Sequence, residues 1–530
     1  MPPLSAYSRH PKQLSNKALY DVAIVGFGPT GAVAAALLGQ YGLKVFVCDS
    51  QTEVYDKPRA IALDHEIMRV FQQIGVLEDI APFIEPFTDS HFFGAEGQLI
   101  KIMSTLPPPY PLGFPPSLVF TQPAIEAALR KAVQKFTNVT VSLGATLTDL
   151  SNGHHEVALQ VRNDSTNETV RAKYLIACDG ASSTVRKALD ICWTDLGFDQ
   201  AWLVVDTVLN AKGLEKLPPF SVQFCEPGRP TTMVIGPGMH RRWEFAINSG
   251  EDSAYLATAE GTWQLLARWL VPTQAKLWRQ ASYRFHALVA QRWRAGRVFL
   301  AGDAAHQQPP FLGQGMCQGI RDAVNLSWKL SAVLQHGAPD ELLASYESER
   351  GAHVRELTSR IKHIGQLVGE RDPEKAKLRD QKLLSEHHGK VIPTPRQNVQ
   401  PPLGPGLRDT LAHAALGTLF PQPWMVRGRL KLRMDDLLGR GWRLFVRAGT
   451  ERRLQRVAKR AHSRHLAVID LENQDWQEAD HVLRTWFETM DCAVVLLRPD
   501  HYVYGVAKTA AQLTKMLDHL QSTDQAKECT

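Results

Sequence analysis

The chain has 530 residues and a formal net charge of +6, and 44% of its residues are hydrophobic and 22% charged. This length predicts about three domains, and the composition excludes a largely disordered chain. Basic residues concentrate between Arg427 and Arg464. That segment fits either a solvated helix face or a surface that attracts an anionic ligand, and we expect no nucleic-acid partner.

Seven cysteines are scattered along the chain, and none forms a CxxC pair. This spacing favours reduced thiols in a cytoplasmic protein over a disulfide framework, and it predicts no metal site. Residues 1–19 are polar, contain three prolines and lack the apolar segment of a signal peptide. No apolar run approaches the ~20 residues that a membrane helix needs, so we expect a soluble protein without a membrane partner.

The first predicted element is a buried parallel strand over 20–25, because the run is short, apolar and rich in β-branched residues. A glycine turn follows at 26–31, then a helix rich in alanine and leucine at 32–41. A second buried strand is predicted at 43–48. This βαβ unit predicts a parallel sheet.

The glycine turn has the pattern Gly26-x-Gly28-x-x-Gly31 between strand and helix. The first glycine permits the tight turn, the second lets the backbone approach a pyrophosphate, and the third lets the helix pack on the strand. The phosphates would meet the free N–H groups of the helix N-terminus. Asp49, 23 residues after Gly26, stands where an acid binds a ribose hydroxyl. The pattern favours a dinucleotide site over a plain packing turn.

The middle of the chain predicts a second sheet and a second anion-binding turn. A helix is predicted at 122–136, a strand ending in Asp179-Gly180, and a mostly antiparallel sheet over 191–295. A buried strand at 298–300 then leads through Gly302-Asp303 and another glycine turn into a helix at 315–334. Two such turns, about 275 residues apart, suit one long cofactor. After these come helices over 340–390, a proline-rich linker over 391–406 and a small α/β domain.

Three motifs follow one another over residues ~20–350. They are the GxGxxG turn, the run from Cys178 to Arg186 (CDGASSTVR), and the run from Gly302 to His306 (GDAAH) with the later PP, GQG and DAVNLSWKL segments. In this order they resemble the class A flavoprotein monooxygenases, the single-component FAD-dependent aromatic hydroxylases. The resemblance implies an α/β fold, with a Rossmann-like FAD-binding domain and an inserted, mostly antiparallel substrate-domain sheet.

The resemblance also implies a domain order. The expected units are an N-terminal tail (1–19), the first part of the FAD-binding domain with some substrate-domain segments (20–190), the substrate-domain sheet (191–295), the FAD-binding return with its helices (296–390), the linker (391–406) and a thioredoxin-like domain (407–530). The last unit resembles the appendage of phenol hydroxylase relatives. Because it lacks CxxC, it should be redox-inactive and structural.

The resemblance assigns an FAD site residue by residue. Gly26, Gly28 and Gly31 would hold the pyrophosphate and Asp49 the adenosine ribose. The other implied cofactor-binding residues are Arg59, Gln122, Asp179, Gly180, Asp303, Pro309, Gly313, Gln314 and Gly315. Among these, Asp179 and Gly180 would serve both FAD and the nicotinamide, and Asp303 would bind the ribityl chain. The chain departs from the family with aspartate in place of the common glutamate at 49, and with Cys317 in place of a frequent asparagine.

The family chemistry implies a substrate class. NADH or NADPH reduces FAD, O₂ adds at flavin C4a, and the hydroperoxide hydroxylates a phenol. Residues 58–66, 241–245 and 498–500 resemble the 3-(3-hydroxyphenyl)propionate hydroxylase branch, which implies a phenolic acid or cinnamate analogue hydroxylated ortho to its hydroxyl. A polyketide or another phenol is the alternative substrate. A homodimer is the assembly expected on general grounds.

A base near the phenol is expected, and the sequence leaves its identity open. Arg242 and His306 are weak catalytic candidates. Arg242, with its neighbour Arg241, would bind a substrate or face solvent. His306 would act as a base or as a structural hydrogen-bond partner. His65 and His286 are expected to be ordinary core or surface histidines.

Overall fold

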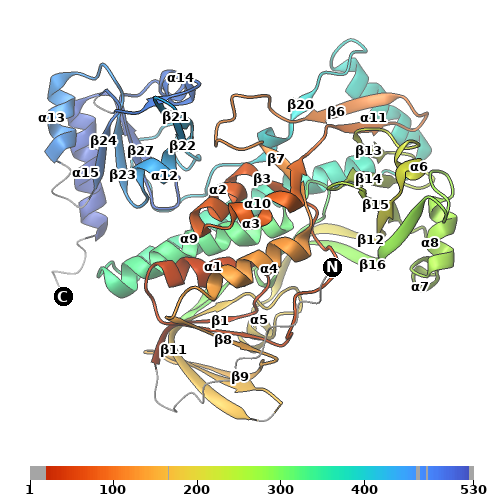
Figure 1. The fold of residues 1–530 in the computed structure, drawn as a ribbon, viewed down its shortest axis with the longest axis horizontal. Coiled ribbons are helices and arrows are strands. Elements are labelled where there is room, and N and C mark those ends of the chain that lie inside the picture. The colour runs from red at the N-terminus through yellow and green to blue at the C-terminus, as the bar shows by residue number, and fades with distance from the viewer. Residues whose placement is uncertain (1–18, 165, 461–465, 473–474, 525–530) are drawn as a thin grey trace.

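The computed structural model describes residues 19–164, 166–460, 466–472 and 475–524. Within these ranges the chain forms two large sheets and a separate C-terminal unit beside them (Figure 1). In this described part no helix is long and apolar enough to cross a membrane.

The nucleotide-binding half is built on an eight-stranded sheet with a parallel centre. Its strands run in the order β17 (Arg294–Ala295), β18 (Val298–Leu300), β11 (Asn167–Ala177), β1 (Leu19–Val25), β2 (Val45–Asp49) and β8 (Val139–Leu143), with β10 (Val157–Arg162) paired to β11 and β9 (Thr146–Asn152) to β10. The apolar run Val22–Ile24 of β1 is fully buried. Full burial suits a parallel strand that is covered on both faces.

Helices cover one face of this sheet. Figure 1 shows α1 (Pro29–Gln40), α4 (Gln122–Val133) and α9 (Gly315–Gln335) packed together above it, with β9 below. The long helix α10 (Glu341–Val368) packs against α9. Around these lie α2 (His65–Ile74), α3 (Leu77–Ile80), η1 (Ala81–Phe83), α5 (Thr184–Ala188) and η2 (Gly302–Ala304), and a small sheet of β3 (Ala62–Asp64), β7 (Ser117–Phe120) and β4 (Ile84–Pro86).

The second large sheet is mostly antiparallel. Its order is β19 (His306–Gln307), β16 (Ala275–Ala290), β12 (Trp193–Leu209), β15 (His240–Ala246), β14 (Thr231–Ile235), β13 (Ser221–Phe224), β5 (Ser90–Phe93), β6 (Leu99–Ser104) and β20 (Thr394–Pro395). β13 runs parallel to β5, and β6 parallel to β20. Segments on both sides of the predicted 191–295 region therefore add strands to this sheet.

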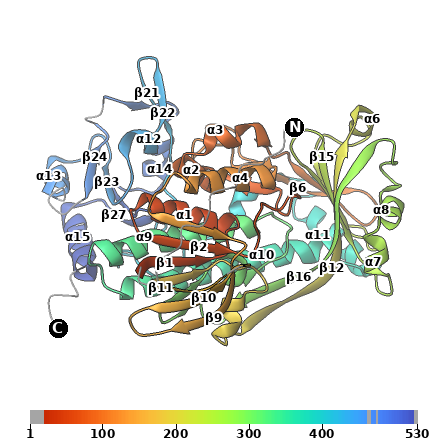
Figure 2. The same cartoon turned by 60° about the horizontal axis from the view of Figure 1, so that its bottom comes forward.

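The two faces of the second sheet differ in polarity. On β15, Trp243 and Phe245 belong to a buried apolar cluster with residues of α7 (Ser253–Leu256) and α8 (Ala259–Leu266), and Figure 2 shows these helices on the outer side of the sheet. α6 (Ala211–Leu214) follows β12. Because side chains alternate along a strand, Arg242 and Glu244 lie on the opposite face, toward the nucleotide-binding half.

The C-terminal unit is a small α/β domain. Its main sheet runs β24 (Ala467–Asp470), β23 (Arg443–Val446), β26 (Val494–Leu497) and β27 (Val503–Ala507), with α13 (Arg452–Arg460), α14 (Val482–Thr489) and α15 (Ala510–Asp524). β23 is parallel to β24 and antiparallel to β26. A second sheet joins β22 (Leu430–Arg433), β21 (Trp424–Arg427) and β25 (Gln477–Glu478) beside α12 (Met434–Leu438). The predicted fold class, including the thioredoxin-like unit, is confirmed.

The basic residues predicted to form either a helix face or an anion-attracting surface lie partly on α13. Arg452, Arg453, Arg456 and Lys459 are exposed, whereas Leu454 of the same helix is buried. This alternation is that of a solvated helix face. The end of the basic segment falls within residues 461–465, which lie outside the described residues.

The segment predicted as a linker has structure of its own. After α11 (Pro373–Ser385), it contains β20, which pairs with β6, and the turn η3 (Arg396–Val399). Arg396 in this segment is buried. The segment therefore packs against the second sheet as well as joining two parts of the chain.

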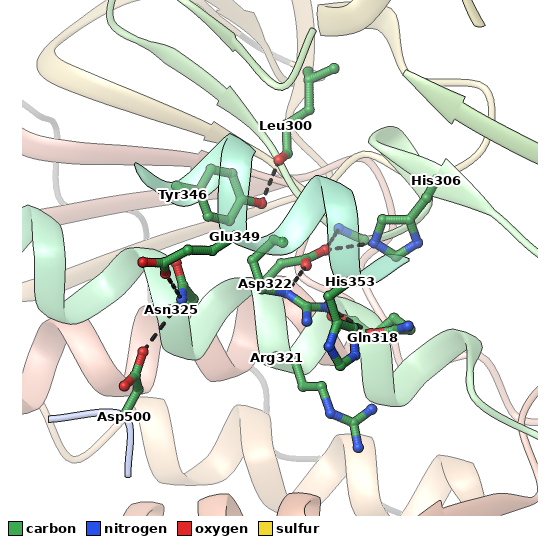
Figure 3. Close-up of polar contacts among 12 residues, drawn as sticks. Leu300, His306, Gln318, Arg321, Asp322, Asn325, Tyr346, Glu349, His353 and Asp500 are labelled. Atoms are coloured by element: carbon green, nitrogen blue, oxygen red, sulfur yellow. Dashed lines mark hydrogen bonds and ion pairs between the residues drawn. The ribbon is translucent and has the colours of Figure 1, made fainter. Parts of the chain in front are cut away.

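Buried ion pairs attach the C-terminal unit to the nucleotide-binding half. Arg498 contacts Glu349 of α10 at 2.7 Å and Asp500 at 2.7 Å, and Lys329 of α9 lies 2.7 Å from Glu349. Figure 3 shows Asn325 between Glu349 and Asp500, with hydrogen bonds of 2.9 and 3.3 Å. Each buried charge in this cluster therefore has an opposite partner.

Candidate active site

The glycine turn between β1 and α1 is shaped by close packing at two positions and by open space at the third. Gly26 has φ of +98°, and a Cβ there would lie 2.2 Å from the Cys178 carbonyl oxygen. A Cβ at Gly31 would lie 2.0 Å from the Gly26 carbonyl oxygen, whereas nothing lies within 4 Å of a Cβ at Gly28. Gly28 is also the N-cap of α1 and has no side-chain cap, so the first N–H groups of the helix are available to an anion.

A cavity of about 1200 Å³ runs from this turn to the second sheet. Eleven of the predicted cofactor-binding and catalytic residues line it, namely Gly26, Gly28, Asp49, Arg59, Gln122, Asp179, Gly180, Arg242, Asp303, Gly313 and Gly315. Three other predicted residues do not line the cavity. Gly31 packs against the backbone of Gly26, and neither Pro309 nor Gln314 is on the cavity wall. The Gln314 side chain instead accepts hydrogen bonds from Arg321 and Gln400.

Three carboxylates stand on the nucleotide-binding side of the cavity. Asp49 accepts hydrogen bonds from the N–H groups of Phe27 at 2.6 Å and Gln51 at 2.8 Å, which ties β2 to the glycine turn. Asp179 accepts one from the Val185 N–H at 3.0 Å. Partial desolvation by the surrounding protein raises the pKa of Asp179 and also that of Asp303. Carboxylates beside an anion-binding turn can accept hydrogen bonds from the hydroxyls of a nucleotide, so this end of the cavity fits FAD.

The loop at residues 58–60 is fixed to both halves of the cavity. The Gln122 side chain accepts hydrogen bonds from the N–H groups of Arg59 at 2.9 Å and Ala60 at 2.5 Å. Arg242 donates to the carbonyl oxygens of Arg59 and Pro58 at 2.7 and 3.0 Å. Gln122 and Arg242 therefore position the backbone of this loop and leave the Arg59 side chain exposed at the cavity.

Arg242 is also paired within the protein. It contacts both carboxylate oxygens of Asp206 on β12, at 2.8 and 3.1 Å. Burial alone would raise the pKa of Asp206, but Arg242 and the hydrogen bond with His240 hold it below its usual value. With its donors used by Asp206 and the loop, Arg242 acts as a positioning group. Its neighbour Arg241 points to the other side, donating to the Gly238 and His240 carbonyl oxygens.

His306 lies outside the cavity lining. Its Nε2 is 2.7 Å from Asp322, as Figure 3 shows, and its ring stacks on Trp293. Asp322 also accepts hydrogen bonds from Arg350 and from the Gly302 N–H, both at 2.9 Å. This geometry fits the structural alternative for His306, since the network fixes the turn that carries Asp303.

The other predicted histidines and Cys317 also have clear environments. His65 is half-buried, and its desolvation lowers its pKa to about 4. His286 lies on the cavity wall, 3.7 Å from Asp199. Cys317 is buried, its Sγ lies 4.0 Å from the Gly313 carbonyl oxygen, and it does not line the cavity. Its thiol therefore does not take over a side-chain contact from the asparagine that is frequent there in the family.

The substrate end of the cavity carries a buried carboxyl group that the sequence analysis did not single out. Glu244 of β15 pairs across the sheet with Val204 and Thr232, and Thr232 pairs with Gln223. All four line the cavity. Burial raises the pKa of Glu244 to about 7, against the opposing charge of Arg242. The wall therefore offers a carboxyl group that can exchange a proton near neutral pH.

Arg396 is a buried cation on the same wall. It donates to Ser90 Oγ at 3.3 Å and to the Leu312 carbonyl oxygen at 3.2 Å, and it lies over the Phe87 ring. No carboxylate of the described residues lies within ion-pair distance, and burial lowers its pKa to about 10. Alternation along β15 was a usable signal for Glu244, because Arg242 and Glu244 alternate with Trp243 and Phe245. No comparable local pattern marks Arg396.

Comparisons with known proteins agree with this geometry. Residues 19–361 match the family described as FAD binding domain, and residues 417–523 match the HcaD C-terminal domain. A probable NADH-specific resorcinol 4-hydroxylase of Rhodococcus jostii (strain RHA1) is 33% identical, over 98% of this chain and 97% of that protein. A 3-(3-hydroxy-phenyl)propionate/3-hydroxycinnamic acid hydroxylase of Mycolicibacterium gilvum (strain PYR-GCK) is 31% identical, over 94% of this chain and 91% of that protein.

Solved structures share the whole fold. The flavin-dependent monooxygenase PieE, in complex with FAD and substrate, has a TM-score of 0.80 at 19% identity, over 96% of this chain and 99% of that one. Aklavinone-11 hydroxylase with FAD and aklavinone has a TM-score of 0.74 at 19% identity, over 95% of this chain and 100% of that one. Together with the family match, these findings show that the chain belongs to the FAD-binding-domain family of flavoprotein monooxygenases and is an FAD-dependent aromatic hydroxylase that uses NAD(P)H and O₂.

Proposed function

We propose that the enzyme hydroxylates a phenolic aromatic acid next to its existing hydroxyl, with 3-(3-hydroxyphenyl)propionate and 3-hydroxycinnamate as model substrates. The observation that carries this proposal is the buried cation Arg396 on the cavity wall. A buried charge is costly unless an opposite charge pairs with it. A substrate carboxylate would supply that partner through charge-assisted hydrogen bonds. The relative from Mycolicibacterium gilvum, named for such acids, supports the same class.

The proposed FAD site combines the cavity residues of the nucleotide-binding half. The glycine turn and the N-terminus of α1 hold the pyrophosphate, Asp49 the adenosine ribose and Asp303 the ribityl chain. Asp179, Gly180, Gly313 and Gly315 complete the contacts, and Arg59 reaches the flavin from the fixed loop. Bound FAD, reduced by NAD(P)H, supplies the oxygen activation that ring hydroxylation needs. Pro309 and Gln314 have less support, because neither lines the cavity.

A neutral dihydroxybenzene is the second candidate substrate. It is favoured by the 33% identity to a protein named as a probable resorcinol 4-hydroxylase. Resorcinol has no carboxylate, so it would leave Arg396 unpaired. The two candidates therefore make opposite predictions for a variant that lacks this cation.

The test uses purified holoenzyme with NADH or NADPH, and it measures oxygen uptake and the hydroxylated product by mass spectrometry. We expect kcat/KM for the two acids to exceed that for resorcinol at least tenfold. Arg396→Met should raise KM for the acids about 10–100-fold, because a charged hydrogen bond contributes roughly 1.5–3 kcal/mol. Arg429→Met, an exposed residue in the turn between β21 and β22, is the control. Equal kcat/KM for resorcinol and for the acids, in the wild type and in Arg396→Met alike, would reject the phenolic-acid proposal.

Three further properties belong to the proposal. The relative named as NADH-specific makes NADH the first reductant to test. The six cysteines of the described residues are all free, which supports a cytoplasmic location. A homodimer stays a prediction from the general frequency of symmetric assemblies, and light scattering tests it.

A further inference from the structure

Glu244 occupies a defined place on the wall of the substrate cavity. It stands in a row of side chains across four strands, with Val204 on one side and Thr232 and Gln223 on the other. Its side chain faces the cavity and is 5% exposed. The Thr232 hydroxyl donates to Gln223 at 2.6 Å and so does not satisfy the carboxyl group.

The neighbouring cation does not neutralise Glu244 through a direct contact. Arg242, two residues earlier on the same face, uses its guanidinium on Asp206 and on the loop carbonyl oxygens of Pro58 and Arg59. Among the described residues, no hydrogen bond or ion pair reaches the Glu244 carboxyl group. Buried polar groups are normally paired, so an unpaired carboxyl on a cavity wall points to a partner that comes with the ligand.

We propose that Glu244 is the catalytic base that takes the proton of the substrate phenol. This inference rests on the proposed function in one respect, namely that the substrate is a phenol. The phenolic O–H bond breaks and an O–H bond forms on the Glu244 carboxylate. The electron pair stays on the phenolate oxygen and spreads into the ring, raising electron density at the ortho and para carbons. The oxygen atom that this ring attacks comes from the established FAD chemistry.

The surroundings of Glu244 suit this step. Burial raises the pKa of the carboxyl to about 7, so it can accept and release a proton near neutral pH. The charge of Arg242 acts against this rise in pKa, and the charge of Asp206 adds to it. The other charged or titratable groups nearby on the wall are Arg279, Tyr283 and His286 of β16 and Arg396.

The first test compares Glu244→Gln with the wild-type holoenzyme and with Glu244→Asp. Glutamine keeps the shape but cannot take a proton, so kcat/KM should fall about 100-fold or more. Aspartate should restore part of the rate. The loss in Glu244→Gln should shrink for a substrate carrying fluorine beside the hydroxyl, because that phenol ionises more easily. The matched control is Glu260→Gln on α8, exposed on the outer side of the sheet. An equal loss for both phenols would assign Glu244 a structural role and overturn the proposal.

The second test measures protons rather than turnover. Titration calorimetry of phenol binding, run in two buffers of different ionisation enthalpy, gives the number of protons released. With wild type at about pH 6 or below, where Glu244 is mostly protonated, binding should release close to one proton, and above about pH 8 almost none. Glu244→Gln should release none at either pH. Release that persists in this variant would identify another group as the proton acceptor and overturn the proposal.

The two tests separate this inference from the proposed function. If the wild-type enzyme hydroxylates none of the phenols but releases a proton through Glu244 on binding them, the proposed phenolic substrate is wrong. The assignment of Glu244 as proton acceptor then stands. If the wild type hydroxylates them and Glu244→Gln matches it in rate and proton release, the activity stands and the base is wrong.

Discussion

Two regions of the molecule bury charged side chains, and they treat them in opposite ways. At the contact between the C-terminal unit and the nucleotide-binding half, Arg498 and Lys329 each pair with Glu349 at 2.7 Å, and Arg498 also pairs with Asp500. On the wall of the substrate cavity, Glu244 and Arg396 are also buried, but neither forms an ion pair with a described residue. The first arrangement holds two domains together, whereas the second leaves charges for a ligand to meet.

The difference shows in the direction of the pKa shifts. Burial would raise the pKa of Glu349, but Arg498 and Lys329 lower it to about 2. Burial raises the pKa of Glu244 to about 7, because the opposing effect of Arg242 is smaller. A buried carboxyl group that is paired with cations thus stabilises the folded state when it is ionised. A buried carboxyl group without such a partner stabilises the folded state when it is protonated.

The largest expected effect is at the domain contact. Arg498→Met leaves Asp500 and part of Glu349 without their buried counter-charge, which should cost about 3–5 kcal/mol of stability. Urea unfolding, followed by tryptophan fluorescence to which Trp328 and Trp442 at this contact contribute, measures it. Arg484→Met, which breaks an exposed pair with Glu488, is the control and should cost less than about 0.5 kcal/mol. Equal shifts in the two variants would remove the distinction between buried and exposed pairs.

A second effect depends on pH and distinguishes the two glutamates. The folded pKa of Glu244 lies above its unfolded value, so its contribution to stability falls as pH rises from about 4.5 to 7. Glu244→Gln should therefore gain stability over wild type across this window, by up to about 3 kcal/mol at pH 8. Glu349 behaves oppositely, since its stabilisation is present above pH ~4.5 and is lost as pH falls toward 2.

Denaturant midpoints of the two proteins at pH 5 and pH 8 test the Glu244 part of this prediction. The ligand-free enzyme is required, because a bound phenol would pair with the carboxyl group. A stability difference between wild type and Glu244→Gln that stays constant with pH would show that the Glu244 carboxyl has an ordinary pKa.

The smallest effect concerns Arg396. Without a ligand, Arg396→Met should leave stability unchanged or raise it by about 1 kcal/mol, because methionine removes an unpaired buried cation and can pack over the Phe87 ring. Differential scanning calorimetry of the ligand-free proteins measures this. A clear loss of stability would mean that the hydrogen bonds to Ser90 and Leu312 make Arg396 a structural residue.

Local patterns predicted the framework better than the substrate end of the cavity. The glycine turn is specified by close contacts between near neighbours, and Gly26, Gly31 and Asp49 lie where the spacing places them. Alternation along β15 also carried information on Glu244, since Trp243 and Phe245 had to face the other side. Arg396 could not be predicted, because it meets Ser90 across 306 residues of sequence. Its proline-rich surroundings indicate a linker, and the pairing of β20 with β6 is a tertiary contact.

The position of Arg396 has an evolutionary consequence. It lies after the FAD-binding match, which ends at residue 361, and before the C-terminal match, which begins at residue 417. A substitution at this position would therefore add or remove a charge on the cavity wall without changing a residue of either matched module. The charge of the substrate cavity can in this way change independently of the two modules that flank the connection.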